Sequence, residues 1–432
     1  MTTLMTVAFR NLTRNRKRTA ITLAALVMGV GIMVFLRGFV DGQQQMMKDN
    51  IAGGRLGGVQ VHKKGYLANI LSTPISLSFP DTPELRAKIM AVKGVVAVAP
   101  RIEFGAMLSM PDKKPAPEDG TSLDEKDFGA TSFFMATAID PQTEGKVTWR
   151  RLQWMKEGEM IPAADAAEVV LNNEFAAGLE AKVHAKGTPL PDIQQQAALL
   201  APDRDGALNG ANVVLGGVYG MGSPGDKRVG LVPLKTAQQL LRMEGEITEY
   251  AIRVEPLSEA TRVRAELQQA LGDGYEVHTW DEIFPFMKEL MGTQDFIFGI
   301  VTRIFLLVVL LGIVNAMLMS VLERVREIGT MLAVGMKRRQ IVSLFLLEGM
   351  ALGFIGGVIG LAFGAAVTAW AGHVGIELPA PGATVSAMLR PTITARYLIE
   401  ALVQAVLGAT IAALWPAFRA SALRPVEALQ SV

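Results

Sequence analysis

The sequence of 432 residues contains no cysteine, and only 6% of its residues are aromatic. Without cysteine the chain can have no disulfide, no thiolate metal ligand and no cysteine nucleophile, so thiol redox chemistry is excluded. An excess of one charge is also absent, because 42 basic and 41 acidic residues leave a formal net charge of +1. There is no overall basic field to attract nucleic acid. We therefore expect no nucleic-acid partner.

Motifs for nucleotide and metal chemistry are missing or incomplete. No G-x-x-x-x-G-K-[ST] occurs, so the chain has no P-loop to hold ATP phosphates. The stretch Gly220-Met-Gly222-Ser-Pro-Gly225 spells G-x-G-x-x-G, but a strand follows it in place of the helix that a dinucleotide needs, which favours a hairpin loop. The four histidines have no second ligand at helical spacing. We expect no catalytic residue, cofactor or metal site in this chain.

Long apolar stretches are abundant. Half of the residues are hydrophobic and the mean hydropathy is +0.30, which is too apolar for an ordinary soluble protein. Four stretches are long enough to cross roughly 30 Å of hydrocarbon as helices: residues 19–41, 296–322, 341–371 and 397–418. The predicted fold class is an α-helical membrane protein with four transmembrane helices.

An excess of basic residues marks one side of the membrane. Residues 1–18 hold five basic residues and no acidic residue, and their spacing predicts an amphipathic helix on the inner surface. A signal peptide is the alternative, but the apolar stretch that follows exceeds the usual length and no small-x-small cleavage site is present. The positive-inside rule places residues 323–340 and the tail 419–432 in the cytoplasm and the short loop 372–396 outside.

Residues 42–295 form one large excursion between the first and second transmembrane helices, and its pattern predicts an α/β (α+β) extracytoplasmic domain. Helices are expected at 82–91 and 258–271. Strands are expected at 95–99, 168–171, 212–218, 229–232, 250–254 and 275–278. The middle strands are predicted to form an inserted β-rich subdomain. Two polar, proline- and glycine-rich stretches, 111–129 and 187–210, are predicted as exposed loops of unknown function.

Two of the spans have features of their own. The second has no strong helix breaker after Pro285, so its helix is expected to begin outside the bilayer as a stalk. The third carries two glycine registers with a spacing of four, which permit close helix contact in lipid. These registers are Gly349, Gly353 and Gly357, and Gly356, Gly360 and Gly364.

The cytoplasmic segment 323–340 carries the strongest resemblance to a known family. Arg326-Glu327-Ile328-Gly329, Ala333-Val334-Gly335 and Leu347-Glu348-Gly349 resemble the signature of FtsX-like/MacB-like permeases of ABC transporters. Both ends of the chain agree, with Arg10-Asn11-Leu12 at the first span and Arg424-Pro425-Val426-Glu427-Ala428 in the tail. The sequence starts directly at the membrane helix, which leads us to expect a permease with a separate ATPase, similar in layout to the lipoprotein-releasing LolC/LolE permeases.

The resemblance implies that residues 323–340 are a coupling helix seated in a groove of a separate ATPase subunit, which binds ATP and Mg. It also implies a MacB-like periplasmic core domain over 42–295, with a porter-like subdomain split by the inserted one. The expected ATPase contacts are Arg324, Arg326, Glu327, Gly329, Ala333, Gly335, Lys337 and Arg338.

Charged and apolar residues within the spans give two further expectations. The intramembrane charges are Arg303, Glu348 and Glu400. Each would be costly at a helix centre, so snorkelling toward the interface is one interpretation, and a pair between Arg303 and Glu400 is another. Candidate cargo-lining residues near the outer ends of the first two spans are Met33, Leu36, Phe39, Phe296, Phe298 and Ile300. The same side chains also suit positions that face lipid.

The expected function is a non-catalytic permease subunit that couples ATP hydrolysis to motion of the periplasmic domain, for release of lipoprotein or lipid from the inner membrane. Alternatives are a regulatory complex that activates a cell-wall hydrolase, and MacB-like efflux with an outer-membrane channel. Expected partners are two ATPase copies, a second permease copy or related permease, the lipid bilayer and a lipoprotein or periplasmic carrier. The resemblance implies a multi-pass protein of the bacterial inner membrane with both termini in the cytoplasm.

Overall fold

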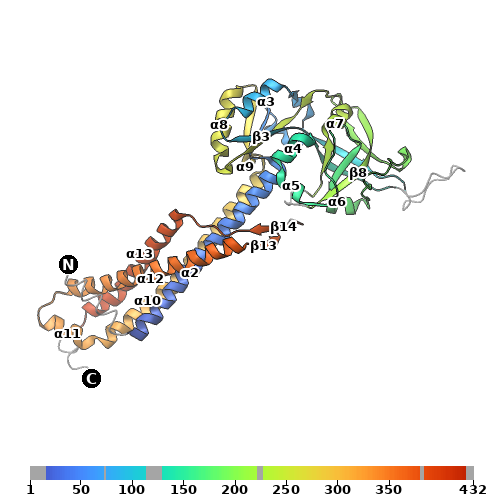
Figure 1. Ribbon diagram of the computed structural model, residues 1–432. Coiled ribbons are helices and arrows are strands. Elements are labelled where there is room, and N and C mark those ends of the chain that lie inside the picture. The colour runs from blue at the N-terminus through green and yellow to red at the C-terminus, as the bar shows by residue number, and fades with distance from the viewer. Residues whose placement is uncertain (1–15, 73, 113–128, 221–226, 380–383, 425–432) are drawn as a thin grey trace. The chain divides into compact units, whose positions relative to one another are not determined.

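The computed structural model describes residues 16–72, 74–112, 129–220, 227–379 and 384–424 (Figure 1). These residues form two compact units. The first, called the helical unit, comprises the described parts of Met1–Gln45, Glu289–Glu377 and Met388–Val432. The second, called the sheet unit, comprises those of Met46–Lys288 and Leu378–Ala387. The predicted inner-surface helix at 1–18 and the end of the tail lie almost wholly outside the described residues.

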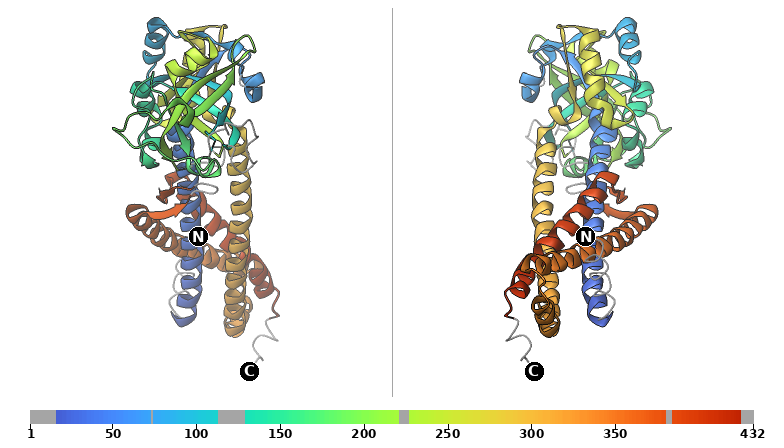
Figure 2. Two further views of the ribbon diagram at one scale, coloured as in Figure 1. Left: turned by 90° about the vertical axis from the view of Figure 1, so that its right-hand side faces the viewer. Right: turned by 90° about the vertical axis from the view of Figure 1, so that its left-hand side faces the viewer.

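Four long helices build the helical unit, and each is long and apolar enough to cross a membrane. They are α2 (Arg16–Ile51), α10 (Pro285–Glu323), α12 (Arg338–Val374) and α13 (Ala395–Ser421). All four predicted spans fall inside them. The helix α10 runs unbroken from Pro285, as the stalk prediction requires, and α2 continues well past the predicted end of the first span. Figure 2 shows α2 in blue and α10 in gold running alongside each other.

The two glycine registers of α12 face two different helices. A Cβ on Gly349 or Gly353 would lie 2.6 or 2.7 Å from the Cβ atoms of Ala413 or Ala409 on α13. In the other register, a Cβ on Gly356 would lie 2.1 Å from the Leu26 side chain on α2, and Gly360 and Gly364 approach α2 in the same way. Glycine is needed here because the neighbouring helices leave no room for a side chain.

One sheet of ten strands forms most of the sheet unit. Its strands are β1 (Val59–Lys63), β3 (Val95–Ser109), β4 (Thr131–Ile139), β5 (Met155–Gly158), β6 (Glu168–Asn172), β7 (Ala197–Pro202), β8 (Leu208–Tyr219), β9 (Val229–Pro233), β11 (Glu249–Val254) and β12 (Tyr275–Thr279). Two small sheets pair β2 (Phe79–Pro80) with β10 (Glu246–Ile247), and β13 (Ile376–Pro379) with β14 (Ser386–Leu389). All six predicted strands are present.

Six of these strands close into a ring, in the order β3, β4, β9, β6, β8, β7 and back to β3. The strands predicted for an inserted subdomain, β6, β8 and β9, all belong to this ring. It is continuous with the outer strands, because the first half of β3 pairs with β11 and its end pairs with β7. The prediction of a loop over 187–210 is wrong in part, since β7 and the start of β8 lie there.

Short helices cover the sheet. They are α3 (Pro83–Met90), α4 (Pro141–Val147), α5 (Trp149–Gln153), α6 (Asn173–Gly178), α7 (Leu234–Leu241), α8 (Ala260–Leu271) and α9 (Trp280–Ile283). The helix α3 begins where predicted, because the Thr82 hydroxyl accepts a hydrogen bond from the Leu85 amide and a proline follows at the first helical position. Val263 and Leu267 of α8 and Ile89 of α3 are fully buried in the core beneath them.

Candidate functional site

A short helix, α11 (Val325–Ala333), connects α10 to α12 and occupies the predicted coupling segment. Only Arg324 separates the end of α10 from the start of α11. After α11, Gly335 adopts a positive φ of 98°, a conformation that favours glycine, and so ends the helix. The α12 helix then begins after Lys337, whose backbone amide donates to the Gln340 side chain over 2.8 Å.

One face of this segment is exposed and basic. Five of the predicted ATPase contacts lie on it: Arg326, Ala333, Gly335, Lys337 and Arg338. Val334, just after α11, is 89% exposed, more than any other large hydrophobic residue among the described parts of the chain. An exposed apolar tip flanked by cations is a surface suited to docking, and no nucleophile or acid–base pair accompanies it.

The opposite face is buried, and it holds two residues that we expected to contact an ATPase. Gly329 is buried beside Ile328, which is 0% exposed and packs in the core of the helical unit. The Arg324 side chain is only 13% exposed and lies against α12. Gly329 and Arg324 thus lie on the buried side of the segment, and their predicted contact with an ATPase stays a prediction. Glu327 lies at its edge, half-buried, with one carboxylate oxygen 3.1 Å from Arg324.

The intramembrane charges are placed differently from the predicted pair. Glu400 pairs with Arg396 of its own helix at 2.8 Å, and Arg303 is exposed, so the predicted pair between Arg303 and Glu400 is not formed. The i to i+4 spacing on α13 supplies Glu400 with a nearer cation. Glu348 is buried, and its carboxylate lies 3.5 Å from the Arg324 guanidinium.

A polar link joins α2 to α10 within the helical unit. Arg37 pairs with Asp41 on its own helix at 2.9 Å and with Asp295 on α10 at 3.0 Å. The Gln44 amide donates to the same Asp295 carboxylate over 3.2 Å. Nothing in the sequence pattern predicts this contact, because the paired residues lie far apart in the chain. The Arg37 side chain connects two helices.

The candidate cargo-lining residues do not share one environment. Met33 is 3% exposed, and its carbonyl accepts a hydrogen bond of 3.4 Å from the Tyr397 hydroxyl, so it packs inside the helical unit. Phe296 is 66% exposed and Ile300 is 39% exposed. Leu36, Phe39 and Phe298 are half-buried. A cargo-lining role stays a prediction for the five residues other than Met33.

The sheet unit contains buried charges that sequence reasoning missed. Arg101 on β3 is 1% exposed and donates to Glu144 over 2.8 and 2.9 Å and to Glu249 over 3.2 Å. Glu249 on β11 also lies 3.3 Å from His62 on β1. With Glu103, two residues along β3 from Arg101, these residues form what we call the buried charge cluster. A charged pair at alternate positions inside an apolar strand was the signal available in the sequence.

The pKa values of the carboxyl groups in this cluster are shifted in different directions. Burial alone would raise the pKa of Glu144, but the charges of Arg101 and Arg151, with the hydrogen bonds from Arg101 and Thr148, together outweigh it, so the pKa lies below the ordinary value. The pKa of Glu249 is also lowered, because its hydrogen bond to His62 and the charge of Arg101 outweigh burial. Burial and the charge of Glu249 raise the pKa of Glu103. Arg101, Glu144 and Glu249 are paired within the cluster, whereas the buried Nδ1 of His62 has no hydrogen-bond partner among the described residues. Nothing in the cluster indicates a reaction.

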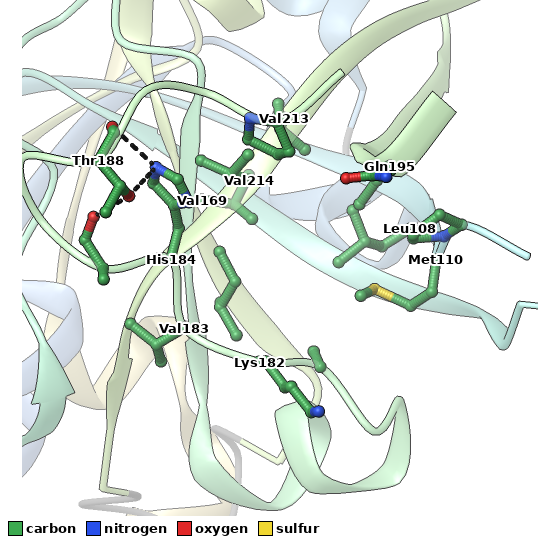
Figure 3. A pocket seen from close by; sticks show the side chains of 16 residues that line it. Leu108, Met110, Val169, Lys182, Val183, His184, Thr188, Gln195, Val213 and Val214 are labelled. Carbon is green, nitrogen blue, oxygen red and sulfur yellow. Dashed lines mark hydrogen bonds between the residues drawn. The ribbon is translucent and has the colours of Figure 1, made fainter. Parts of the chain in front are cut away.

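A half-open pocket of about 380 Å³ lies at the ring of strands in the sheet unit (Figure 3). Its wall is largely aliphatic and includes Leu108, Val169 and Val213. His184 on its edge is held by Thr188, whose carbonyl and hydroxyl oxygens lie 3.3 and 3.1 Å from the imidazole Nε2. The volume is within the range of about 300–1,000 Å³ typical of ligand pockets, but no pair of groups poised for catalysis lines it.

Family comparisons agree with this architecture. The model of the MacB-like periplasmic core domain matches residues 19–270, and the model of the FtsX-like permease C-terminal domain matches residues 299–425. The first match includes α2 and most of the sheet unit. The second includes most of α10, together with α11, α12 and α13.

Curated relatives are similar to parts of the chain. The macrolide export ATP-binding/permease protein MacB of Brucella abortus is 26% identical over 381 residues, which are 85% of this chain and 53% of that protein. MacB of Nitrobacter winogradskyi is 29% identical over 218 residues, which are 49% of this chain and 32% of that protein. The ABC transporter permease YknZ of Bacillus subtilis is 30% identical over 165 residues, which are 37% of each chain. The chain thus spans about half or less of the length of these relatives.

Among solved structures, the periplasmic region of MacB from Actinobacillus actinomycetemcomitans aligns with 10% identity and a TM-score of 0.33, covering 56% of this chain and 95% of that one. The extracellular domain of YknZ aligns with 13% identity and a TM-score of 0.30, covering 51% of this chain and 99% of that one.

Proposed function

Because the chain belongs to the family of MacB-like and FtsX-like permeases of ABC transporters, we propose that it converts ATP hydrolysis by a separate cytoplasmic ATPase subunit into movement of its periplasmic domain. The site that carries this proposal is the exposed face of α11 and the turn after it. Arg326, Lys337 and Arg338 are exposed in the same segment as Val334, which is 89% exposed and so is not covered by any other described residue. In this proposal the helical unit receives the movement of the ATPase, and the sheet unit moves in response.

Docking of an ATPase is tested best at Val334. The residue is exposed, so Val334→Glu should leave the fold intact while it opposes an apolar contact. We expect weaker binding and weaker stimulation of the ATPase that copurifies with the chain. Two other changes are less informative. Glu327→Ala also removes a partner of Arg324, and Gly335→Trp strains a backbone with positive φ.

The matched control is Ile193→Glu in the sheet unit, which also replaces an exposed apolar residue but lies outside the four spans and the segment 323–340. It should leave ATPase binding unchanged in detergent. Equal binding by wild type and Val334→Glu would contradict docking through this face.

Topology follows from the same proposal, and the absence of cysteine makes it measurable. In this background a single cysteine at Arg339 should react with thiol reagents only from the cytoplasmic side, because the segment is basic. A single cysteine at Lys186, whose side chain is 79% exposed in the sheet unit, should react from the outer side of the inner membrane. Labelling of both from one side would contradict the proposed orientation.

An assembly of two permease subunits and two ATPase copies is the simplest one in which closing ATPases bring two α11 segments together. Each chain supplies one such segment among its described residues. We propose either a homodimer or a pair with a related permease. Native mass spectrometry of the solubilised complex distinguishes the two.

For the cargo we propose a lipoprotein or lipid taken from the outer leaflet, since apolar residues such as Phe296 and Ile300 are exposed on α10. The printed name of the MacB relatives, macrolide export, supports efflux as a second candidate. A regulatory complex that activates a cell-wall hydrolase is a third. Complexes in proteoliposomes with labelled lipoprotein or macrolide decide between the first two, and ATP-dependent release of neither favours the third.

A further inference from the structure

The turn between α10 and α11 places one residue in contact with three helices, through its backbone amide and its side chain. Arg324 is the single residue between the end of α10 and the start of α11, and its own amide still donates to Val321 of α10 over 3.2 Å. Its guanidinium donates to Glu327 in the first turn of α11 over 3.1 Å. The same group lies 3.5 Å from the Glu348 carboxylate on α12. Its carbon atom is 5.9 Å from the centre of the Phe345 ring on α12.

These contacts are buried. The side chains of Arg324 and Glu348 are 13% and 4% exposed, and Phe345 is fully buried. A buried ion pair is a poor way to gain stability, because removing two charges from water costs about as much as their attraction returns. What such a pair does provide is orientation, because the two charges hold each other in one geometry. Ile328 of α11 also packs in the core of the helical unit with Phe345, but this apolar contact does not fix a direction.

We propose that Arg324 and Glu348 form a latch that fixes α11 to α12 and transmits the displacement of the docking segment into the membrane helices. The proposal rests on the proposed function and deepens it, because it separates docking from transmission. Arg326, Lys337 and Arg338 bind the ATPase from the exposed face. Arg324 faces inward and is a positioning residue for the motion that follows.

The first arm of the test needs no ATPase. A nitroxide on Thr330→Cys, an exposed position of α11 in this cysteine-free chain, reports how firmly α11 is held. In full-length protein in nanodiscs we expect Glu348→Gln to increase the mobility of this label, because the neutral amide no longer holds the guanidinium. Mobility equal to wild type would overturn the latch. This result stands whether or not an ATPase binds.

The second arm uses the complex with the copurifying ATPase. An environment-sensitive fluorophore on Val374→Cys, the exposed last residue of α12, reports the change in the permease on ATP addition. Allosteric coupling typically changes an equilibrium constant by about 5- to 150-fold. Loss of the link should lower the equilibrium constant of the ATP-dependent change in α12 by about that factor. We expect Glu348→Gln to retain ATPase affinity but to lose most of the signal. An undiminished signal would overturn transmission through the latch.

Two further variants separate the latch from a general structural role. Arg326→Met, a change on the exposed face, should lower ATPase affinity but leave the signal of the bound complex intact. The charge swap of Arg324→Glu with Glu348→Arg should restore both the signal and the low mobility of α11. A swap no better than the single changes would overturn the pair as the transmitting element. If the wild-type protein bound no ATPase, the proposed function would be contradicted. The mobility of the label on α11 would still test the latch.

Discussion

The interiors of the two units of this protein are packed in different ways. The sheet unit buries large apolar side chains such as Phe104 and Phe134, together with the buried charge cluster around Arg101. The helical unit also buries large residues such as Phe345, but its helices α12 and α13 meet through small ones, with Ala405 and Ala409 of α13 against the glycines of α12. Water drives large apolar groups into a core, whereas lipid offers no such drive, so helices there depend on close contact. Each interior should therefore fail through a different substitution.

The largest expected effect is in the buried charge cluster. Arg101→Met keeps much of the side-chain volume but removes the guanidinium shared by the buried Glu144 and Glu249, leaving Glu144 with only the longer contact of 3.6 Å to Arg151. Removing one partner of a buried pair costs about 3–5 kcal/mol. We expect the sheet unit of the full-length protein in micelles to be cleaved at a much lower urea concentration in pulse proteolysis.

The control for this change is Lys186→Met. Lys186 and Glu159 lie 2.7 Å apart, but their side chains are 79% and 61% exposed. An exposed pair contributes at most about 1 kcal/mol, so this variant should resemble wild type. If both variants lost the same stability, the buried pairs of Arg101 would contribute no more than the exposed pair of Lys186.

The next effect is in the helical unit, where an added methyl group is the sensitive change. A Cβ on Gly364 would lie 2.8 Å from both the Gly31 carbonyl oxygen and the Val34 Cβ on α2. Overpacking of this kind costs about 1–3 kcal/mol, because the backbone must move. Gly364→Ala should lower the thermal midpoint in micelles, whereas Gly312→Ala on α10, with no atom within 4 Å of its Cβ, should not. Equal midpoints for the two would contradict close packing.

The difference between the interiors also explains what the sequence could predict. The four spans were predictable because hydropathy is a local property, and the glycine registers of α12 were visible by spacing. The helices that these registers face were not, since α2 lies far away in the sequence. Strand β7 was missed because the proline- and glycine-rich sequence around it predicts a loop.

Contacts between charges were the least predictable part of the site. Arg101 meets Glu144 and Glu249 across 43 and 148 positions of sequence, so no motif links them. Arg324 belongs to a basic segment and resembles its exposed neighbours in sequence, yet it faces α12. The direction of a side chain depends on how the helices pack, and spacing within one helix does not determine that.

A smaller effect on stability, which changes with pH, is expected at Glu103. Its pKa is raised in the folded protein by burial and the charge of Glu249. The stability that its proton confers is complete below the ordinary value of 4.5 and is lost as the pH rises through the raised pKa. Glu103→Gln does not titrate, so its stability relative to wild type should increase as the pH rises from 4.5 to 8.

The matched variant Glu144→Gln should behave in the opposite way. The pKa of Glu144 is lowered, so its contribution is present above its ordinary value and is lost as the pH falls through the folded pKa. Urea midpoints measured at several pH values test both variants. Parallel pH profiles for the two would contradict the opposite directions of their pKa shifts.

The smallest effect is expected at the link between α2 and α10, which is the exposed counterpart of the buried charge cluster. Arg37 and Asp295 are 33% and 45% exposed, so water and salt screen their attraction. Arg37→Met should cost at most about 1 kcal/mol, less than Gly364→Ala. The difference from wild type should shrink in high salt when thermal midpoints are compared. A loss of stability that is larger than that of Gly364→Ala and independent of salt would mean that this link, more than close packing, holds α2 against its neighbours.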